Sequence, residues 1–558
     1  MADDIFGQTP DVHNAGSSSI DPAAEFRDSA RDLVAQASGT SADFFALRSV
    51  GSVRSTSSVS SDHWEGLEEN DSSVLAEESQ CVSLAARRSP MPVRFIGLPH
   101  ELPFTPSILL NYYFDHVCTI VCTFDGPKNP FRTVMSARWP HSAIAFTAAQ
   151  SLSAACLAKQ TVELKPIAVL ARKEASRALG TEIKAAAGLT PDRLNELLLG
   201  LLLLGVSSSW HDPNDMGIRY YSVAVAVTRM SSMKKAKEQS NSNNNAFFQQ
   251  ALTYWWMLLT LVSDPSKHFL ELPPHLGTVD RIGPLILDNS VILLHPWAGI
   301  STEAQVLLGR VARHAQALRI VRQKETSDPL DDSLHDFVSE ATGREVEEQA
   351  INLQTHFRHE IADPEDPEVD LNGFVAINDA YRDAILILIY RTFPGILRSR
   401  HGAATRTGVE GVTSDQHSRA TTAQPEKGRK QDLFNLALHV LETLSRFDRS
   451  SRILGLTPHL LIIAAGELRP LPDSRSAEAD ASVPLEEPCC QFRSAPANIA
   501  DLRIFALDFA EKLMHFFHFM PLNRMRDTMI ETWRRMDQGE DAFWLDIMNE
   551  KGWEAFMG

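Results

Sequence analysis

The sequence has little cysteine and no long apolar run. Its 558 residues include six cysteines, of which Cys489 and Cys490 are adjacent. So few thiols make no disulfide framework, and we expect a reducing compartment. The longest fully apolar run, residues 197–206, is about half of the roughly 20 residues that span a bilayer, so it predicts a buried helix and no membrane contact. Acidic residues follow Met1 where a secretory signal carries positive charge, so we expect no export.

Positive charge is also scarce. Lys and Arg total 53 against 71 Asp and Glu, which gives a formal net charge of −18. A field of that sign repels phosphate backbones, so the overall charge does not favour a nucleic-acid binder. Two short basic runs, residues 234–237 and 427–430, lie in predicted loops. Each fits a nuclear import signal, although a solvated run of loop charges is the favoured interpretation.

The motifs of common catalytic sites are missing. The sequence contains no GxGxxG after a predicted strand, no GxxxxGK[ST] phosphate loop, no HExxH and no GxSxG. We therefore predict that the chain is not an enzyme, has no catalytic residues and binds no cofactor. An enzyme with an unusual site in a cavity of a helical bundle is the least favoured alternative.

Three pairs of potential metal ligands lie three or four residues apart, a spacing that places both side chains on one face of a helix. They are His356 with His359, His515 with His518, and Cys118 with Cys122. None is accompanied by further ligands at the spacing of a known metal site. The favoured interpretation is a polar helix face for the first pair, packing histidines for the second and buried thiols for the third, and we predict no metal site.

Residues 1–95 are rich in Ser, Asp, Glu and Ala, and they have too few apolar residues to offset the entropy cost of ordering the chain. We predict a disordered acidic tail. Residues 1–100 contain seven Arg, no Lys and fifteen Asp or Glu, a net charge of −8. Within the tail, residues 43–47 and 62–69 place bulky apolar side chains among carboxylates, which suits them to a partner's groove; a solvated linker is the favoured alternative.

From about residue 96 onward the pattern is helical. Thr190 precedes Pro191, a capping hydroxyl before a proline at the first helical position. No sustained period-two alternation predicts a sheet, so residues 96–558 are expected to form an all-α irregular multi-helix bundle or solenoid-like array. Helices are predicted over 105–124, 141–158, 163–187, 190–206, 216–230, 246–263, 302–323, 335–361, 374–396, 431–447, 457–468, 498–519, 521–536 and 541–549, with loops near 231–245, 398–430 and 470–496.

Three widely spaced segments form a distinctive combination: residues 112–132, residues 456–467 and the aromatic-rich residues 533–558. The residues that stand out in them are Tyr113, Phe114, Cys118, Asn129, Pro130, Phe131, Pro458, Gly466, Glu467, Trp533, Trp544, Gly552 and Trp553. In this order and spacing they resemble the regulatory domain of fungal-specific transcription factors, the zinc binuclear-cluster family, over roughly residues 105–558. Their large aromatic rings are interpreted as structural anchors of a closing helix pair.

The resemblance implies a helical regulatory module, nuclear residence and control of transcription, often of a fungal metabolic or secondary-metabolite gene set. Members of the family usually carry an N-terminal cluster of six cysteines that binds two zinc ions beside a basic helix. Residues 1–80 contain no cysteine, and Cys81 stands alone. Either an upstream exon encodes the cluster, or a DNA-binding partner reads the DNA and this chain makes no DNA contact of its own.

The main hypothesis is therefore a transcriptional regulator that acts through a helical effector or oligomerisation domain, as a homo- or hetero-oligomer or with other transcription proteins. The alternative is a helical scaffold or interaction protein with no role in transcription. A small metabolite could also bind between sub-bundles and shift their packing. Residues 254–257 (Tyr-Trp-Trp-Met) are a candidate lining for that cavity, although ordinary core is the favoured interpretation.

Overall fold

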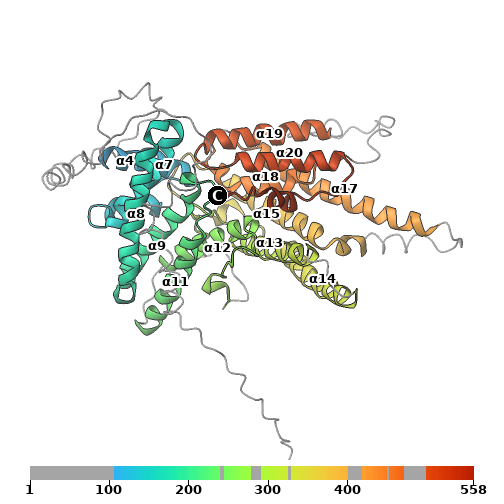
Figure 1. Cartoon of the computed structure of the whole chain (residues 1–558), viewed down its shortest axis with the longest axis horizontal. Coiled ribbons are helices and arrows are strands. Elements are labelled where there is room, and N and C mark those ends of the chain that lie inside the picture. The colour runs from blue at the N-terminus through green and yellow to red at the C-terminus, as the bar shows by residue number, and fades with distance from the viewer. Residues whose placement is uncertain are drawn as a thin grey trace, which may run out of the picture.

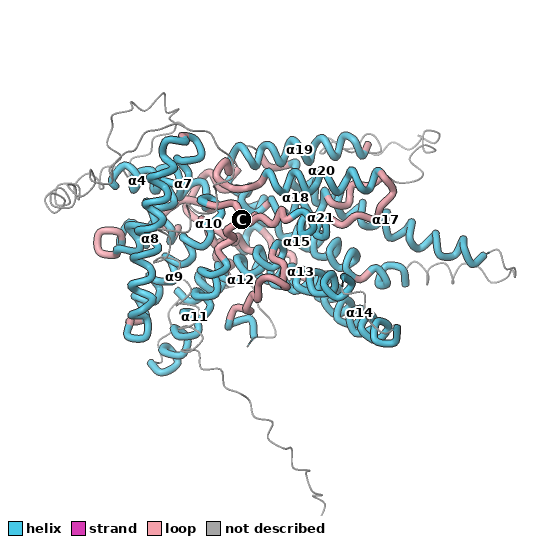
Figure 2. Tube along the Cα trace, viewed as in Figure 1, coloured by secondary structure: helices cyan, strands magenta, loops and turns pink. Residues whose placement is uncertain are grey.

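The computed structural model describes residues 106–238, 244–277, 291–323, 329–399, 417–448, 451–470 and 498–557. Within these ranges all regular secondary structure is helical. The only β-type pairings there are two isolated bridges, Ile292 with Ile361 and His295 with Gly299. The prediction of an all-α fold is confirmed (Figure 2). The predicted tail over residues 1–95 and nearly all of the predicted loop near 470–496 lie outside the described residues.

The first group of helices gathers at one end of the molecule (Figure 1). α7 packs against α4, α8 and α9, and α9 in turn packs against α11. The bounds are α4 Pro106–Tyr112, a π-helical turn Tyr113–Val117, α5 Cys118–Val121, α6 Pro130–Arg138, α7 Ala143–Gln160, α8 Lys165–Ala185, α9 Pro191–Val206, α10 Ser208–His211, α11 Ile218–Glu238 and α12 Asn244–Val262.

The second group packs in sequence order, with α12 on α13, α13 on α15 and α15 on α17. α18 lies among α15, α17, α19 and α20, and α20 packs on α21. The chain end labelled C lies near the middle of the molecule, where the two groups meet (Figure 1). The bounds are α13 Thr302–Gln323, α14 Pro329–Ile351, α15 Leu371–Thr392, α17 His417–Ser445, α18 Pro458–Ala465, α19 Ile499–Phe516, α20 Asn523–Asp537 and α21 Trp544–Lys551.

The leucine-rich run is a fully buried helix, as predicted. Thr190 caps α9 by accepting a hydrogen bond from the backbone N–H of Arg193 at 3.5 Å. Along this helix, Gly200 and Gly205 allow neighbours to approach its backbone. A Cβ added at Gly205 would lie 2.2 Å from the ring of Trp255 on α12. This close contact brings α9 and α12 together and buries the helix on all sides.

Several predicted boundaries are wrong. The loop predicted from residue 231 is helical up to Glu238, because the Lys, Ala, Met and Glu residues there are good helix formers. The loop predicted over 398–430 is helical from His417 onward. Conversely, the helix predicted over 335–361 ends at Ile351, and Ile361 instead pairs with Ile292. In each case, either local helix propensity or a long-range pairing outweighed the polar pattern that we read as a boundary.

We predict that Gly205→Ala destabilises the fold by about 1–3 kcal/mol, because the added methyl group would have to displace the buried Trp255 ring. Gly188→Ala is the matched control, because nothing lies within 4 Å of the position that its Cβ would occupy. That substitution should be neutral or slightly stabilising. Urea unfolding measures the change in the free energy of unfolding for both variants, provided that the m value is constant. Equal urea midpoints for the two variants would contradict the proposed packing.

Candidate functional site

The first predicted anchor group ties α6 to the turn after α4. Asn129 Oδ1 accepts a hydrogen bond from the N–H of Phe131 at 3.0 Å, and Pro130 occupies the first turn of α6. The carbonyl of Phe131 in turn accepts the Tyr113 hydroxyl at 3.1 Å and lies 3.7 Å from Cys118 Sγ. Asn129 thus caps α6 and orients the Phe131 carbonyl, which in turn binds Tyr113 of the π-helical turn. These hydrogen bonds give Asn129, Phe131 and Tyr113 a structural role.

An ion pair reinforces the same junction. Arg132 Nε donates to Asp125 Oδ1 at 2.6 Å, and the Arg132 guanidinium also donates to the carbonyl of Phe114. The guanidinium carbon lies 5.9 Å from the centroid of the Phe114 ring. Burial alone would lower the pKa of Arg132, but Asp125 outweighs this effect and raises it, so the arginine stays charged.

The closing aromatic segment docks on the end of α18. Trp533 Nε1 on α20 donates to the carbonyl of Ala465 at 2.7 Å. Trp544 on α21 is 1% exposed, and a Cβ at Gly466 would lie only 2.7 Å from its ring. The glycine is therefore needed for the close approach of α21 to α18.

The remaining anchors begin and end these helices. Pro458 stands in the first turn of α18, where a missing N–H costs nothing. Gly552 ends α21 with a φ of +63°, a left-handed conformation that favours glycine. The Trp553 side chain that follows it is half-buried against the core.

A buried charge cluster joins four segments beneath this closing pair. We define it as Arg391 of α15, Arg429 of α17, Glu467 and Arg469 after α18, and Asp541 before α21. Glu467 has no exposed side-chain surface, and its carboxylate lies 3.0 Å from Arg391 Nε and 3.3 Å from Arg469 Nη2. Asp541 lies 2.7 Å from Arg391, 2.5 Å from Arg469 and 3.3 Å from Arg429.

The electrostatics keep this cluster ionised. Burial alone would raise the pKa of Asp541, but Arg391 and Arg469 outweigh it and hold that pKa well below its usual value. For Arg391, burial works toward a lower pKa, and Glu467 and Asp541 together raise it. The carboxylates therefore stabilise arginines that are at most 7% exposed, with Glu467 fully buried and Asp541 half exposed.

Sequence reasoning identified only Glu467 of this cluster. The available signal was a glutamate directly after an apolar helix, which requires a buried cation nearby. The partners come from positions that are distant in the sequence, and Arg429 belongs to the basic run 427–430. That run is part of α17 and not a loop, and Arg429 is 2% exposed with its side chain turned toward Asp541. The prediction of a loop is therefore wrong for this run, in which Lys427 is exposed and Arg429 is buried.

The two predicted histidine pairs do not assemble. α14 ends before His356. The His356 side chain is buried, with Nδ1 3.9 Å from Glu360 Oε2, while His359 is exposed and stacks on Phe357. The prediction that His356 and His359 share a helix face is therefore wrong.

The second histidine pair is split by the end of α19 at Phe516. His515 is exposed on the last turn, whereas His518 lies beyond the helix and pairs with Gln160 Nε2 at 3.0 Å. The prediction that they share a helix face is likewise wrong, and only His518 is held by packing.

The cysteines are buried in apolar surroundings. α5 ends at Val121, so Cys122 has extended backbone and does not continue the helix from Cys118. Burial raises the pKa of Cys118 to about 12 and raises that of Cys122 well above its ordinary value. Cys156 of α7 is buried in the same way, with a raised pKa. All three are neutral thiols that pack as small apolar side chains.

A buried network of tyrosine and histidine, which the sequence reading missed, lies between the two helix groups. His459 Nε2 of α18 pairs with the hydroxyl of Tyr381 of α15 at 2.8 Å, and Nδ1 of the same ring has no hydrogen-bond partner. The Tyr254 ring stands edge-on to both His459 and Trp297. Burial lowers the pKa of His459 to about 3, so the ring is neutral near pH 7.

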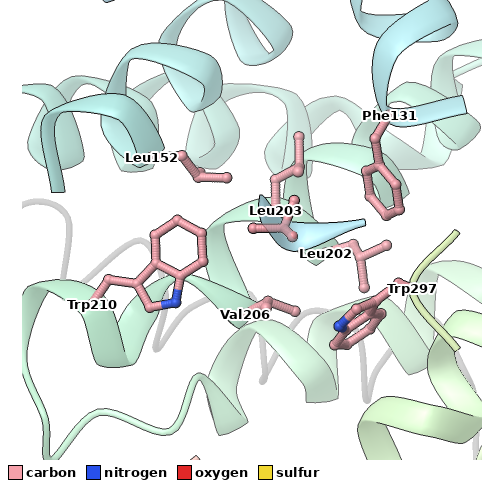
Figure 3. Close-up of a pocket in the computed structure, with 8 residues that line it drawn as sticks. Phe131, Leu152, Leu202, Leu203, Val206, Trp210 and Trp297 are labelled. Atoms are coloured by element: carbon pink, nitrogen blue, oxygen red, sulfur yellow. The ribbon is translucent and has the colours of Figure 1, made fainter. Parts of the chain in front are cut away.

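A small apolar cavity lies where α7, α9 and α10 meet (Figure 3). Its volume is about 20 Å³, which is room for about one water molecule. It is lined by Val121, Phe131, Leu152, Leu202, Leu203, Val206, Trp210 and Trp297. None of residues 254–257 lines it, and these four side chains are buried in the core.

No group of three or more His, Cys, Asp or Glu side chains in the described ranges is placed to hold a metal ion. Among the helices of the same ranges, none has both the length and the apolar character needed to cross a membrane.

The fold and the charge cluster define an all-helical domain whose polar contacts hold helices together. A family model described as the fungal specific transcription factor domain matches residues 108–558. The chain therefore belongs to the fungal-specific transcription factor domain family, and every anchor residue predicted above lies within the match. The comparisons found no matching curated protein and no matching solved structure.

We predict that Glu467→Gln destabilises the domain by about 3–5 kcal/mol, because it leaves Arg391 and Arg469 buried with too little negative charge. Glu368→Gln is the control: Glu368 pairs with Arg452 but its side chain is 73% exposed, so the change should stay within about 0.5 kcal/mol. Urea unfolding of both variants measures this difference. A Glu467→Gln midpoint equal to that of the control would refute the role of the cluster.

We also predict that the domain loses stability below pH 6.5. Burial lowers the pKa of both His295 and His459 to about 3. The unfolded chain takes up these protons near pH 6.5 and the folded chain does not, so stability falls as pH drops from 6.5 toward 3. The slope is about 1.4 kcal/mol per pH unit for each histidine once the pH is well below 6.5.

Urea midpoints between pH 7 and pH 5 measure this slope. Burial also lowers the pKa of His211 to about 3 and that of His275 to about 4, so both add to the slope. His459→Gln should therefore reduce it by about a quarter, since one of four such histidines is removed. His141→Gln, at an exposed position, should leave it unchanged. A wild-type stability that stays constant from pH 7 to pH 5 would contradict the neutral state of the buried rings.

Proposed function

We propose that the chain is a nuclear regulator of transcription that controls a fungal metabolic or secondary-metabolite gene set. The observation that carries this proposal is the family match over residues 108–558, which includes nearly all of the helical body described above. The buried charge cluster supports it, because it ties the last matched segment to the core of the same domain.

In this proposal the domain acts through association. Its cysteines are not spaced as a binuclear zinc cluster, and Cys118, Cys122 and Cys156 are buried neutral thiols. These cysteines therefore offer no ligands for the family's DNA-reading module, and the sequence recognition would come either from a zinc cluster encoded upstream or from a DNA-binding partner. The helical domain would serve as the effector or oligomerisation surface, and the acidic residues 1–95 would serve as a contact for other transcription proteins.

A tethering experiment tests the proposal. The full chain is fused to a heterologous DNA-binding module in a fungal reporter strain, and transcript levels are also compared with and without the gene. We predict a several-fold change of reporter output in either direction, retained by Glu368→Gln and lost by Glu467→Gln at equal expression, because only the latter disturbs the buried cluster.

Two results would count against the proposal. No change of reporter output, together with unchanged transcripts after deletion of the gene, would favour a helical scaffold with no role in transcription. Exclusion of the full chain from the nucleus under all growth conditions would also contradict it.

A further inference from the structure

α8 carries an apolar stripe on the face turned away from the molecule. The helix lies along one edge of the structure (Figure 1) and buries Ala175, Leu179 and Ile183 against its neighbours. On the opposite face, Val169 and Leu170 are 61% and 53% exposed. Val162 and Pro166, just before them, are also exposed and fall on the same face at spacings of three and four residues.

The same stripe becomes basic toward the end of α8. Lys173, Arg177 and Lys184 are exposed and continue the stripe at helical spacing, and Lys165 lies beside its apolar part. Among these described cations, Arg177 pairs with Glu174 on the same helix. An apolar patch followed by exposed cations is unusual on a chain whose net charge is −18, and it matches an acidic segment that also carries bulky apolar side chains.

We propose that residues 62–69 of this chain bind the apolar and basic stripe of α8. The segment Asp-His-Trp-Glu-Gly-Leu-Glu-Glu has four carboxylates around Trp64 and Leu67. The two apolar side chains would cover Val169 and Leu170, and this burial would supply most of the affinity. The carboxylates would face the cations of α8 and set the direction of the segment, since exposed ion pairs add little affinity.

The chain is long enough to reach this site. α4, which begins at Pro106, and α8 both pack against α7. Thirty-six residues separate Glu69 from Pro106. A flexible linker of that length spans about 33 Å on average, close to the roughly 31 Å length of α8. The tether therefore holds the segment near α8 at an effective concentration of about millimolar, so a weak contact suffices.

Residues 62–69 are preferred over a second copy of α8 as the occupant because of charge. Two copies of the stripe would bring Lys173 and Arg177 of one chain toward the same cations of the other, which is unfavourable. The acidic segment instead brings opposite charge. In the bound state, Trp64 and Leu67 would be covered by α8. Another protein that binds residues 62–69 would therefore have to compete with α8.

Hydrogen–deuterium exchange of the full-length chain, labelled on the millisecond timescale, tests the proposal. In the wild-type chain, amides of residues 62–69 should exchange about tenfold more slowly than in the double variant Val169→Asp, Leu170→Asp, the factor expected when the segment is bound about nine-tenths of the time. Ile530→Asp, at another exposed apolar position on α20, should keep the wild-type protection. Unchanged exchange in the other helices would show that each variant is folded.

A reciprocal variant identifies the occupant. Trp64→Ala with Leu67→Ala should speed exchange in residues 165–173 by removing their cover, at every protein concentration. Equal exchange of residues 62–69 in the wild-type and α8 variants would overturn the proposal. So would protection of α8 that persists in the Trp64 and Leu67 variant and rises with concentration, because that result would assign the stripe to a second copy of the chain.

Discussion

A fully buried glutamate held between arginines is the contact on which the second half of the structure depends. Glu467 pairs with Arg391 and Arg469, and the half-exposed Asp541 contacts both of these arginines and Arg429. Each of four segments contributes at least one charge, and the removal of Glu467 would leave buried arginines with too little negative charge, at a cost of several kcal/mol. Such a cluster adds little net stability over an apolar core, but it makes the arrangement of α15, α17, α18 and the segment before α21 interdependent.

The first half is joined to this frame by close packing, with ion pairs such as Lys128 with Glu365 nearer the surface. Gly205 lets α9 approach Trp255 of α12, and a Cβ at Gly309 of α13 would lie 2.4 Å from the ring of Trp256. α12 thereby contacts both helix groups. Because the buried charges and rings face inward, the features left for association lie on the surface, among them the stripe of α8. This division fits a domain whose proposed role is to bind partners.

Much of the fold could be predicted from the sequence, because the apolar periodicity, the caps and the buried leucine run are local signals. Thr190 with Pro191 marks the start of α9, and the absence of period-two alternation excludes a sheet. The wrong boundaries have non-local causes. The polar stretch before Glu238 stays helical through propensity, and beyond the end of α14 Ile361 pairs with Ile292, which is distant in the sequence.

The candidate site was less predictable. Glu467 could be identified as a residue in need of a partner, but Arg391 and Asp541 lie 76 and 74 residues away from it in the sequence, and nothing local connects them. The His459 and Tyr381 pair is equally non-local. Histidines at a spacing of three residues suggested shared faces that the helix ends then divided. Spacing predicts a shared face only within a helix whose end is known.

The central claim is that the charge cluster makes these segments open together. Native-state hydrogen exchange in low urea tests it most directly by comparing the opening free energies of α15, α18 and α21. The account predicts one shared value that falls with urea at the global slope for all three helices. Amides of α21 that exchange through a separate opening of much lower free energy would contradict it, because the closing segment would then be only loosely attached.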